Sequence, residues 1–488
     1  MLLTTKPHGM LVRVFAFSLA ASMTALGAAT AIAEDFSLGL GISGSGDVEG
    51  YRNLYTKEQA SLLYTNGPFQ AFAALVMSSD GKYGASAAGG YLDNAAVVME
   101  ESGLRFKNEF FLAEAGRLRP SDIVESPYSL FVSDAPNQSL GARYTLSGEA
   151  VSMTTRWLSL VERSGLGYAD RGAVLKTYAL KLGKLRLAYQ DAAVYTANSS
   201  STPNPISTDL RFSNFDAEYF FNPLPGFVIQ NLNSLGEQPR RMSQNDNAIM
   251  GLYAEWEDEN LFSYFQLLVD DINLNRFFAP EQRMLPDKLG LSLGGRLATE
   301  LGRFGFYTGG ATKYSFEAYG LDSYDSQYGY TYVPDVSYSV GGSTRPILLE
   351  DNMIGFKLGE NALGLKGTWD KEFGSLAAEA GLELTIKGDQ SPANPWHGGV
   401  SAPFETEFLN DALLETKLIA SGGVSWRWVD LRLMLSGKAG YTWNPLGLVA
   451  AEDGGKAILR PQAGSALAAA LTVSLHYALD LLALMGVK

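Results

Sequence analysis

Residues 418–443, LIASGGVSWRWVDLRLMLSGKAGYTW, alternate apolar and polar side chains, and the phase of this alternation changes once. Up to Trp428 the apolar residues fall on even numbers, and from Leu431 onward they fall on odd numbers. A period of two is the strand period, and residues that flank a two-residue hairpin loop lie opposite each other on one face. The pattern predicts an antiparallel hairpin with Val429 and Asp430 in the loop and one continuous apolar face.

Two further stretches show the same alternation. In KTYALKLGKLRLAYQ (176–190) the phase changes at Gly183, which predicts a hairpin with Tyr178 opposite Tyr189. In GSLAAEAGLELTIKG (374–388) the even positions are apolar and most odd positions are polar. These arms exceed ten residues, whereas strands of soluble domains average about 5–6. The length favours strands that cross a membrane, with secreted soluble β-domains as the alternative.

The aromatic residues of 418–443 indicate which solvent the apolar face meets. Trp426 and Trp428 lie near the turn, and Tyr441 and Trp443 lie at the far end of the hairpin. With a rise of roughly 3.3 Å per residue and a tilt of ~40°, the two pairs are roughly 20–30 Å apart in height. That height matches the ~25 Å apolar band between the aromatic girdles of outer-membrane barrels. The apolar face is therefore expected to contact lipid.

We predict an all-β fold, a single antiparallel transmembrane β-barrel of about 18 strands (16–20), with long extracellular loops and short periplasmic turns. The lipid face is expected to hold Leu180, Leu187, Leu382, Leu433 and Leu435, and the lumen Lys181, Arg186, Glu383 and Lys438. Leu433→Arg is expected to impair assembly by a few kcal/mol (roughly), and Lys438→Ala to be mild.

Three long stretches lack the alternation and are rich in loop residues: 192–246, 314–350 and 388–412. Loops of this length usually carry function, and in barrels of this class they are extracellular.

The N-terminal segment is typical of an export signal. Lys6 and Arg13 precede an apolar run that ends in Ala31-Ile32-Ala33, the small residues that a signal peptidase needs. We expect a cleaved signal peptide at 1–33, an outer-membrane barrel at 34–488, and a location in the cell outer membrane. The net charge of −14 makes nucleic acid an unsuitable partner, and the absence of cysteine excludes disulfides.

Catalysis finds little support in the sequence. Only three histidines are present, and His8 belongs to the expected signal peptide. Asp270 and Asp271 resemble a glycosidase acid pair, but neighbouring strand residues point to opposite faces, so a polar strand end is the better interpretation. A twelve-residue calcium loop is missing as well. We expect no enzyme activity, no cofactor and no metal site.

The segment YSFEAYGLDSYDSQYGYTYVPDVSY (314–338) is the candidate binding site. Exposed aromatic rings stack on sugar faces, and acids hydrogen-bond sugar hydroxyls. A lipid-facing rim or a loop packed over the barrel mouth gives the same composition. The predicted carbohydrate site has Tyr324, Tyr328, Tyr330 and Tyr332 as stacking rings, and Asp322, Asp325 and Asp335 as hydroxyl partners.

The middle of the chain resembles the Wzi-type capsule assembly family of outer-membrane barrels. The similarity covers seven blocks in family order: SLFVSDAPNQSLGARY (129–144), LRLAYQDAAVY (185–195), AEYFFNPLPGFVIQN (217–231), DNAIMGLYAEW (246–256), FQLLVDDI (265–272), PDKLGLSLGG (286–295) and IGFKLGENA (354–362). It implies a barrel of about 18 strands that holds exported polysaccharide at the cell surface. No binding residue is carried over from the family.

The function expected on these grounds is binding, assembly or attachment of a capsule-like surface polysaccharide. The alternatives are a porin or uptake channel for small solutes and a surface adhesin, because the charged luminal residues are compatible with an open or a closed lumen. Outer-membrane lipid, surface polysaccharide and the outer-membrane assembly machinery are the expected partners, and a monomer is the expected state.

Overall fold

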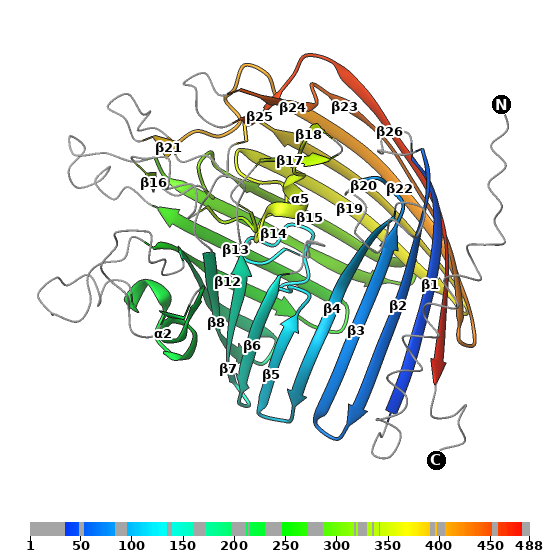
Figure 1. Ribbon diagram of the computed structural model, residues 1–488, viewed down its shortest axis with the longest axis horizontal. Helices are drawn as coiled ribbons and strands as arrows, with labels where there is room; N and C mark the ends of the chain where they lie inside the picture. The colour runs from blue at the N-terminus through cyan, green and yellow to red at the C-terminus, as the bar shows by residue number, and fades with distance from the viewer. Residues whose placement is uncertain are drawn as a thin grey trace, which may run out of the picture.

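The fold is a closed antiparallel β-barrel of 18 strands, in which β26 pairs with β1 to close the sheet (Figure 1). The computed structural model describes residues 35–47, 53–82, 95–133, 139–160, 171–196, 211–212, 214–229, 246–271, 286–316, 319–320, 329–333, 336–340, 342–390, 396–397, 406–450 and 457–480. The predicted fold class and strand number are confirmed. The expected signal peptide at 1–33 lies outside the described residues.

Each barrel strand pairs with the next barrel strand along the chain. The barrel strands are β1 (Asp35–Asp47), β2 (Leu54–Asn66), β3 (Phe69–Ser78), β4 (Ala96–Lys107), β5 (Phe111–Arg117), β6 (Leu140–Ser147), β7 (Val151–Leu160), β8 (Arg171–Leu182), β9 (Leu185–Thr196), β12 (Asn247–Glu257), β13 (Leu261–Asp271), β14 (Lys288–Thr299), β15 (Gly302–Ala311), β19 (Ala362–Phe373), β20 (Leu376–Lys387), β22 (Glu415–Trp428), β23 (Leu431–Trp443) and β26 (Ser465–Asp480).

Short elements lie in the connections between these strands. They are β10 (Arg211–Phe212), β11 (Phe215–Asp216), α2 (Ala217–Phe221), β16 (Tyr319–Gly320), β17 (Ser337–Val340), β18 (Ser343–Pro346), α5 (Leu349–Asn352), β21 (Trp396–His397), β24 (Leu446–Val449) and β25 (Ile458–Pro461). Within the described part of the chain, no helix is long and apolar enough to cross a membrane.

The predicted hairpin registers are confirmed. Trp428 pairs with Leu431 across the two-residue turn, and Val429 takes a positive φ of 51° there. Tyr178 pairs with Tyr189, with the two ring centroids 6.1 Å apart. The period-two pattern therefore gave the correct register even though Val-Asp is an unusual turn sequence.

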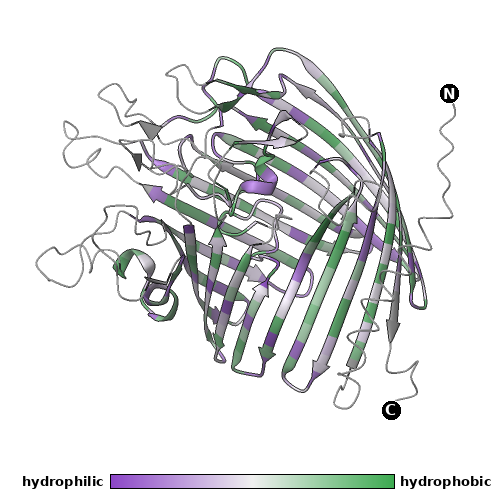
Figure 2. Cartoon of the chain, in the orientation of Figure 1, coloured by the Kyte–Doolittle hydropathy of each residue, from purple (hydrophilic) through white to green (hydrophobic). Residues whose placement is uncertain are grey.

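The predicted division into an outward and a luminal face is also confirmed. The five leucines expected on the lipid face are 38–55% exposed on the outside of the wall. Lys181 and Arg186 line one luminal cavity and Lys438 another, while Glu383 forms ion pairs inside the barrel. Figure 2 shows apolar and polar bands in alternation along the strands.

The two ends of the barrel differ. Tight turns such as Gly183-Lys184 and Val429-Asp430 lie at one end, which we call the turn end, and the long connections lie at the other, the loop end. In barrels of this class the turn end faces the periplasm. Trp426 stacks on Trp428 near the turns, and Tyr441 contacts Trp443 near the loops. The aromatic girdles thus lie where the sequence predicted them.

Candidate functional site

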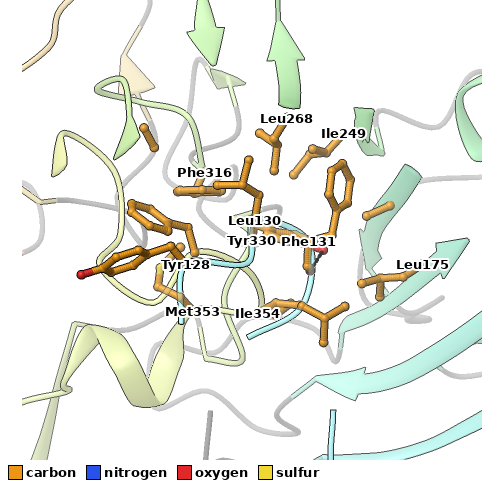
Figure 3. Close-up of a cluster of buried hydrophobic side chains, with 14 of the residues drawn as sticks. Tyr128, Leu130, Phe131, Leu175, Ile249, Leu268, Phe316, Tyr330, Met353 and Ile354 are labelled. Atoms are coloured by element: carbon orange, nitrogen blue, oxygen red, sulfur yellow. Dashed lines mark hydrogen bonds between the residues drawn. The ribbon is translucent and has the colours of Figure 1, made fainter. Parts of the chain in front are cut away.

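The lumen holds a packed plug made from three chain segments, residues 120–133, 329–333 and 349–361. The first belongs to the connection between β5 and β6, and the other two belong to the connection between β15 and β19. The plug forms the main buried cluster of the molecule together with inward side chains of β8, β12 and β13 (Figure 3). Its most deeply buried apolar side chains are Tyr128, Leu130, Phe131, Tyr330, Met353, Ile354 and Phe356. A barrel interior filled in this way is a core, and the plug closes the part of the lumen that it occupies.

A buried network of amides joins the plug to the wall. Gln266 of β13 accepts a hydrogen bond from the backbone N–H of Leu130 at 2.9 Å and donates to Asp122 at 2.8 Å and to Gln190 at 2.7 Å. Gln190 of β9 also donates to Asp122 at 2.6 Å, and Ser129 donates to the same carboxylate. Because buried amides are costly unless every group is paired, this network fixes the position of residues 122–130.

The opposite side of the plug is bound to β19 and β20. The Tyr128 hydroxyl donates to Glu383 of β20 at 2.9 Å, and Lys357 and Lys366 lie 3.7 and 3.5 Å from the same carboxylate. The Tyr128 ring lies against Gly364, where an added Cβ would approach the ring atoms to 2.6 Å. The plug therefore reaches across the lumen from β9 and β13 to β20.

Arg171 at the start of β8 holds the second plug segment. Its buried guanidinium donates to the carbonyl oxygens of Gly329 at 3.0 Å and Thr331 at 2.7 Å. Tyr330, between them, stacks on Phe316 and donates its hydroxyl to the Phe131 carbonyl at 2.6 Å. Burial raises the pKa of the Tyr330 phenol well above its ordinary value, so the ring stays a neutral donor.

This placement corrects part of the predicted carbohydrate site. Tyr330 and Tyr332 are 0% and 2% exposed, so they are plug residues and not exposed stacking rings. The reason is that the strand-like spacing of these tyrosines reflects a short bridge between Thr331 and Met353 inside the lumen. The other predicted site residues, Tyr324, Tyr328, Asp322, Asp325 and Asp335, lie outside the described residues, and their role stays a prediction.

A second unexpected feature lies on the outside of the wall. Residues 214–229, which we call the outer clasp, belong to the long connection between β9 and β12 and include α2, which lies beside β7 and β8 (Figure 1). Asp216 caps α2 by accepting from the N–H groups of Glu218 and Tyr219 at 2.9 and 3.0 Å. The apolar underside of the clasp packs on outward residues of β8 and β9: Val174, Ala193 and Tyr195.

The clasp covers two charged residues on the outward face. Lys176 of β8 and Asp191 of β9 lie directly opposite each other, in phase with the lipid-facing Leu180 and Leu187. Both are almost fully buried. Lys176 donates to the carbonyls of Asn222 at 2.7 Å and Leu224 at 2.6 Å, and Asp191 accepts from the Gly226 N–H.

Aromatic side chains of the wall complete the attachment of the clasp. The Tyr178 hydroxyl donates to the Pro223 carbonyl at 2.9 Å, and the Trp157 indole donates to the Asn214 carbonyl at 2.8 Å. On its outer side the clasp leaves Phe221 65% and Leu224 41% exposed. The clasp thus gives an apolar exterior to a polar part of the wall.

The luminal wall away from the plug is lined by small polar residues. One cavity of about 480 Å³ lies along β19, β20, β22, β23 and β26, and another of about 470 Å³ along β1, β2, β22, β23 and β26. Ser421, Ser436 and Thr472 line the first, and Gly39, Gly41 and Ser61 line the second. The plug therefore leaves polar space along this side of the barrel.

Among the described residues, no group of three or more His, Cys, Asp or Glu side chains could hold a metal ion. Asp270 forms an ion pair with Lys288 at 3.2 Å at the end of β13, which is the structural role that the sequence favoured.

No family model and no curated protein matches the chain. Among solved structures it is similar to Wzi, an outer-membrane protein involved in group 1 capsule assembly in Escherichia coli and described as a carbohydrate-binding β-barrel: identity 10%, TM-score 0.54, covering 94% of this chain and 87% of that chain. It is also similar to OccK8 (OprE) of Pseudomonas aeruginosa at 9% identity and TM-score 0.46, covering 92% and 98% of the two chains. OccD3 (OpdP) of Pseudomonas aeruginosa has 10% identity and TM-score 0.44, covering 93% of each chain. The likeness to Wzi shows the fold, an outer-membrane β-barrel.

Proposed function

We propose that this chain is a plugged outer-membrane barrel that holds exported polysaccharide at the cell surface. The observation that carries the proposal is the plug, which is fixed to β9 and β13 on one side and to β20 on the other. A wide diffusion pore needs a free lumen, whereas a surface-binding barrel needs only a rigid scaffold beneath its loops. The fold shared with Wzi, itself described as a carbohydrate-binding barrel, supports the same proposal.

Glycan retention in the cell of origin tests this proposal. Loss of the chain is expected to move polysaccharide from the washed cell pellet to the medium, and the unaltered chain is expected to restore it. A Tyr324→Ala/Tyr328→Ala variant is expected to lower the retained glycan severalfold, because both rings belong to the tyrosine-rich segment 314–338, the predicted carbohydrate site. Tyr64→Ala, at the turn end of β2, is the control that should restore retention. Equal retention with and without the chain would contradict the proposal.

Passage of small solutes is the second candidate function, and the polar cavities of about 480 and 470 Å³ beside the plug favour it. Planar-bilayer recordings separate the two functions. The plugged holder is expected to show no large stable conductance steps. Gln266→Ala, which removes the bonds to Leu130, Asp122 and Gln190, is expected to produce frequent short openings.

The control for these recordings is Gln70→Ala, because Gln70 is a luminal amide that binds Arg105 and not the plug. It should leave the recordings silent. Large stable steps from the unaltered chain would establish the solute channel and contradict the plugged holder.

A further inference from the structure

Two arginines and a histidine form one row across neighbouring strands at the turn end of the lumen. Arg427 of β22 lies directly opposite Arg432 of β23, and Arg432 lies directly opposite His476 of β26. All three line the luminal cavity of about 470 Å³, close to the Val429-Asp430 turn. The row therefore faces the aqueous mouth that is periplasmic in barrels of this class.

The row lacks the acids that neutralise other luminal arginines. Glu114 of β5 binds both Arg105 and Arg143, and Asp370 binds Arg303 at 2.9 Å. Neither Arg427 nor Arg432 forms an ion pair with any described acid, and Asp430 is the one acid among the described residues that line the cavity. Like charges directly opposite each other on paired strands destabilise a sheet, so the pairing of Arg427 with Arg432 has an electrostatic cost.

The neighbouring strand makes room for the row. Gly41 of β1 pairs with His476, and an added Cβ at Gly41 would come within 2.7 Å of the imidazole Nδ1. The imidazole therefore lies across the glycine, beside the cavity that Gly39 and Ser61 also line. This leaves space for a small ligand next to both guanidinium groups.

We propose that Arg427, Arg432 and His476 bind an oxyanion, a carboxylate or phosphate group carried by a solute at the turn-end mouth. A guanidinium binds such groups through two parallel N–H bonds, and an imidazole N–H adds a third donor. A bound anion reduces the repulsion between Arg427 and Arg432. The proposal goes beyond the proposed function, because the site lies at the opposite end of the barrel from the long loops.

Calorimetric titration of the purified full-length barrel in detergent at low salt tests this site. Glucuronate and glucose 6-phosphate are the two charged probes, and glucose is the neutral probe. Binding of at least one charged probe, with none of glucose, is the expected result, and the two charged probes distinguish a carboxylate from a phosphate preference. Affinity should fall as salt rises, because exposed charges are screened. Arg427→Gln/Arg432→Gln is expected to weaken binding by about tenfold or more, a free-energy loss of about 1.4 kcal/mol.

Arg303→Gln is the matched control, because Arg303 is also an arginine at the turn end but already has Asp370 as its partner. It should leave the affinity for the charged probe unchanged. The heat-dependent gel mobility of each variant confirms that the barrel is folded. Absence of binding by the unaltered chain, or equal binding by the double variant and Arg303→Gln, would overturn the proposal. Neither outcome depends on glycan retention. The calorimetric test can therefore contradict the anion site without contradicting the proposed function.

Discussion

Lys176→Met is expected to release the outer clasp and to destabilise the barrel by about 3–5 kcal/mol. The substitution removes the two hydrogen bonds to the carbonyls of Asn222 and Leu224. It also leaves Asp191, which is buried on the outward face, without its cationic neighbour. A buried charge without compensation is among the largest single-residue effects known. Urea unfolding in phospholipid vesicles, followed by tryptophan fluorescence, measures the change in the free energy of unfolding.

Two variants decide whether the effect comes from the clasp. Lys181 lies on the same strand as Lys176, but its side chain faces the lumen. Lys181→Met is therefore expected to change the free energy of unfolding little. Adding Asp191→Asn to Lys176→Met should recover part of the loss, because the second substitution removes the uncompensated charge. Equal costs for Lys176→Met and Lys181→Met would show that the clasp does not depend on this pair.

The natural absence of cysteine allows a direct measurement of clasp position. A single cysteine introduced by Leu224→Cys lies on the outer surface of the clasp, and a polar maleimide reagent should label it slowly if lipid covers it. Labelling should accelerate in the Lys176→Met background, because the released clasp moves into water. The same fast rate in both backgrounds would contradict a membrane-covered clasp.

The register and the faces of the barrel could be predicted because they depend on local alternation. The phase changes at Gly183 and at Val429-Asp430 determine which residues pair across each hairpin, and one buried or lipid-covered face makes that register unambiguous. The sequence contains a weaker indication of the outer clasp. Lys176 and Asp191 fall in phase with lipid-facing residues, and a charge at such a position requires a cover.

The plug could not be predicted because its contacts join distant parts of the chain. Residues 120–133 show no strand period, and their partners Gln190, Gln266 and Glu383 lie far along the sequence. The burial of Tyr330 and Tyr332 could not be predicted either, since a period of two does not distinguish a solvent-facing strand from a short buried bridge. The pairing of Arg427 with Arg432 follows from the predicted hairpin, but the position of His476 beside Arg432 depends on the pairing of β26 with β23, which local alternation does not specify.

Leu382→Arg is expected to reduce the stability of the membrane-inserted barrel by about 2–4 kcal/mol, because a guanidinium at the bilayer midplane loses its hydration. Leu382 lies at the middle of β20, is 55% exposed outward, and pairs with Gly367 and Ala420, which leave it little cover. Leu433 lies near the Val429-Asp430 turn, close to the membrane interface. The expected cost of Leu433→Arg is therefore about 0–1 kcal/mol, which is lower than the few kcal/mol (roughly) that the sequence pattern predicts.

Lys438→Ala, on the luminal face of β23, is the control and should change stability little, because its side chain faces an aqueous cavity. The unfolding free energy of all three variants is measured in vesicles. Leu382→Arg should lower it most, and Leu433→Arg and Lys438→Ala should lower it little. If Leu382→Arg were tolerated as well as Lys438→Ala, the outward face of β20 would not contact lipid. The assignment of every strand face would then be wrong, since antiparallel pairing links each face to its neighbours around the closed barrel.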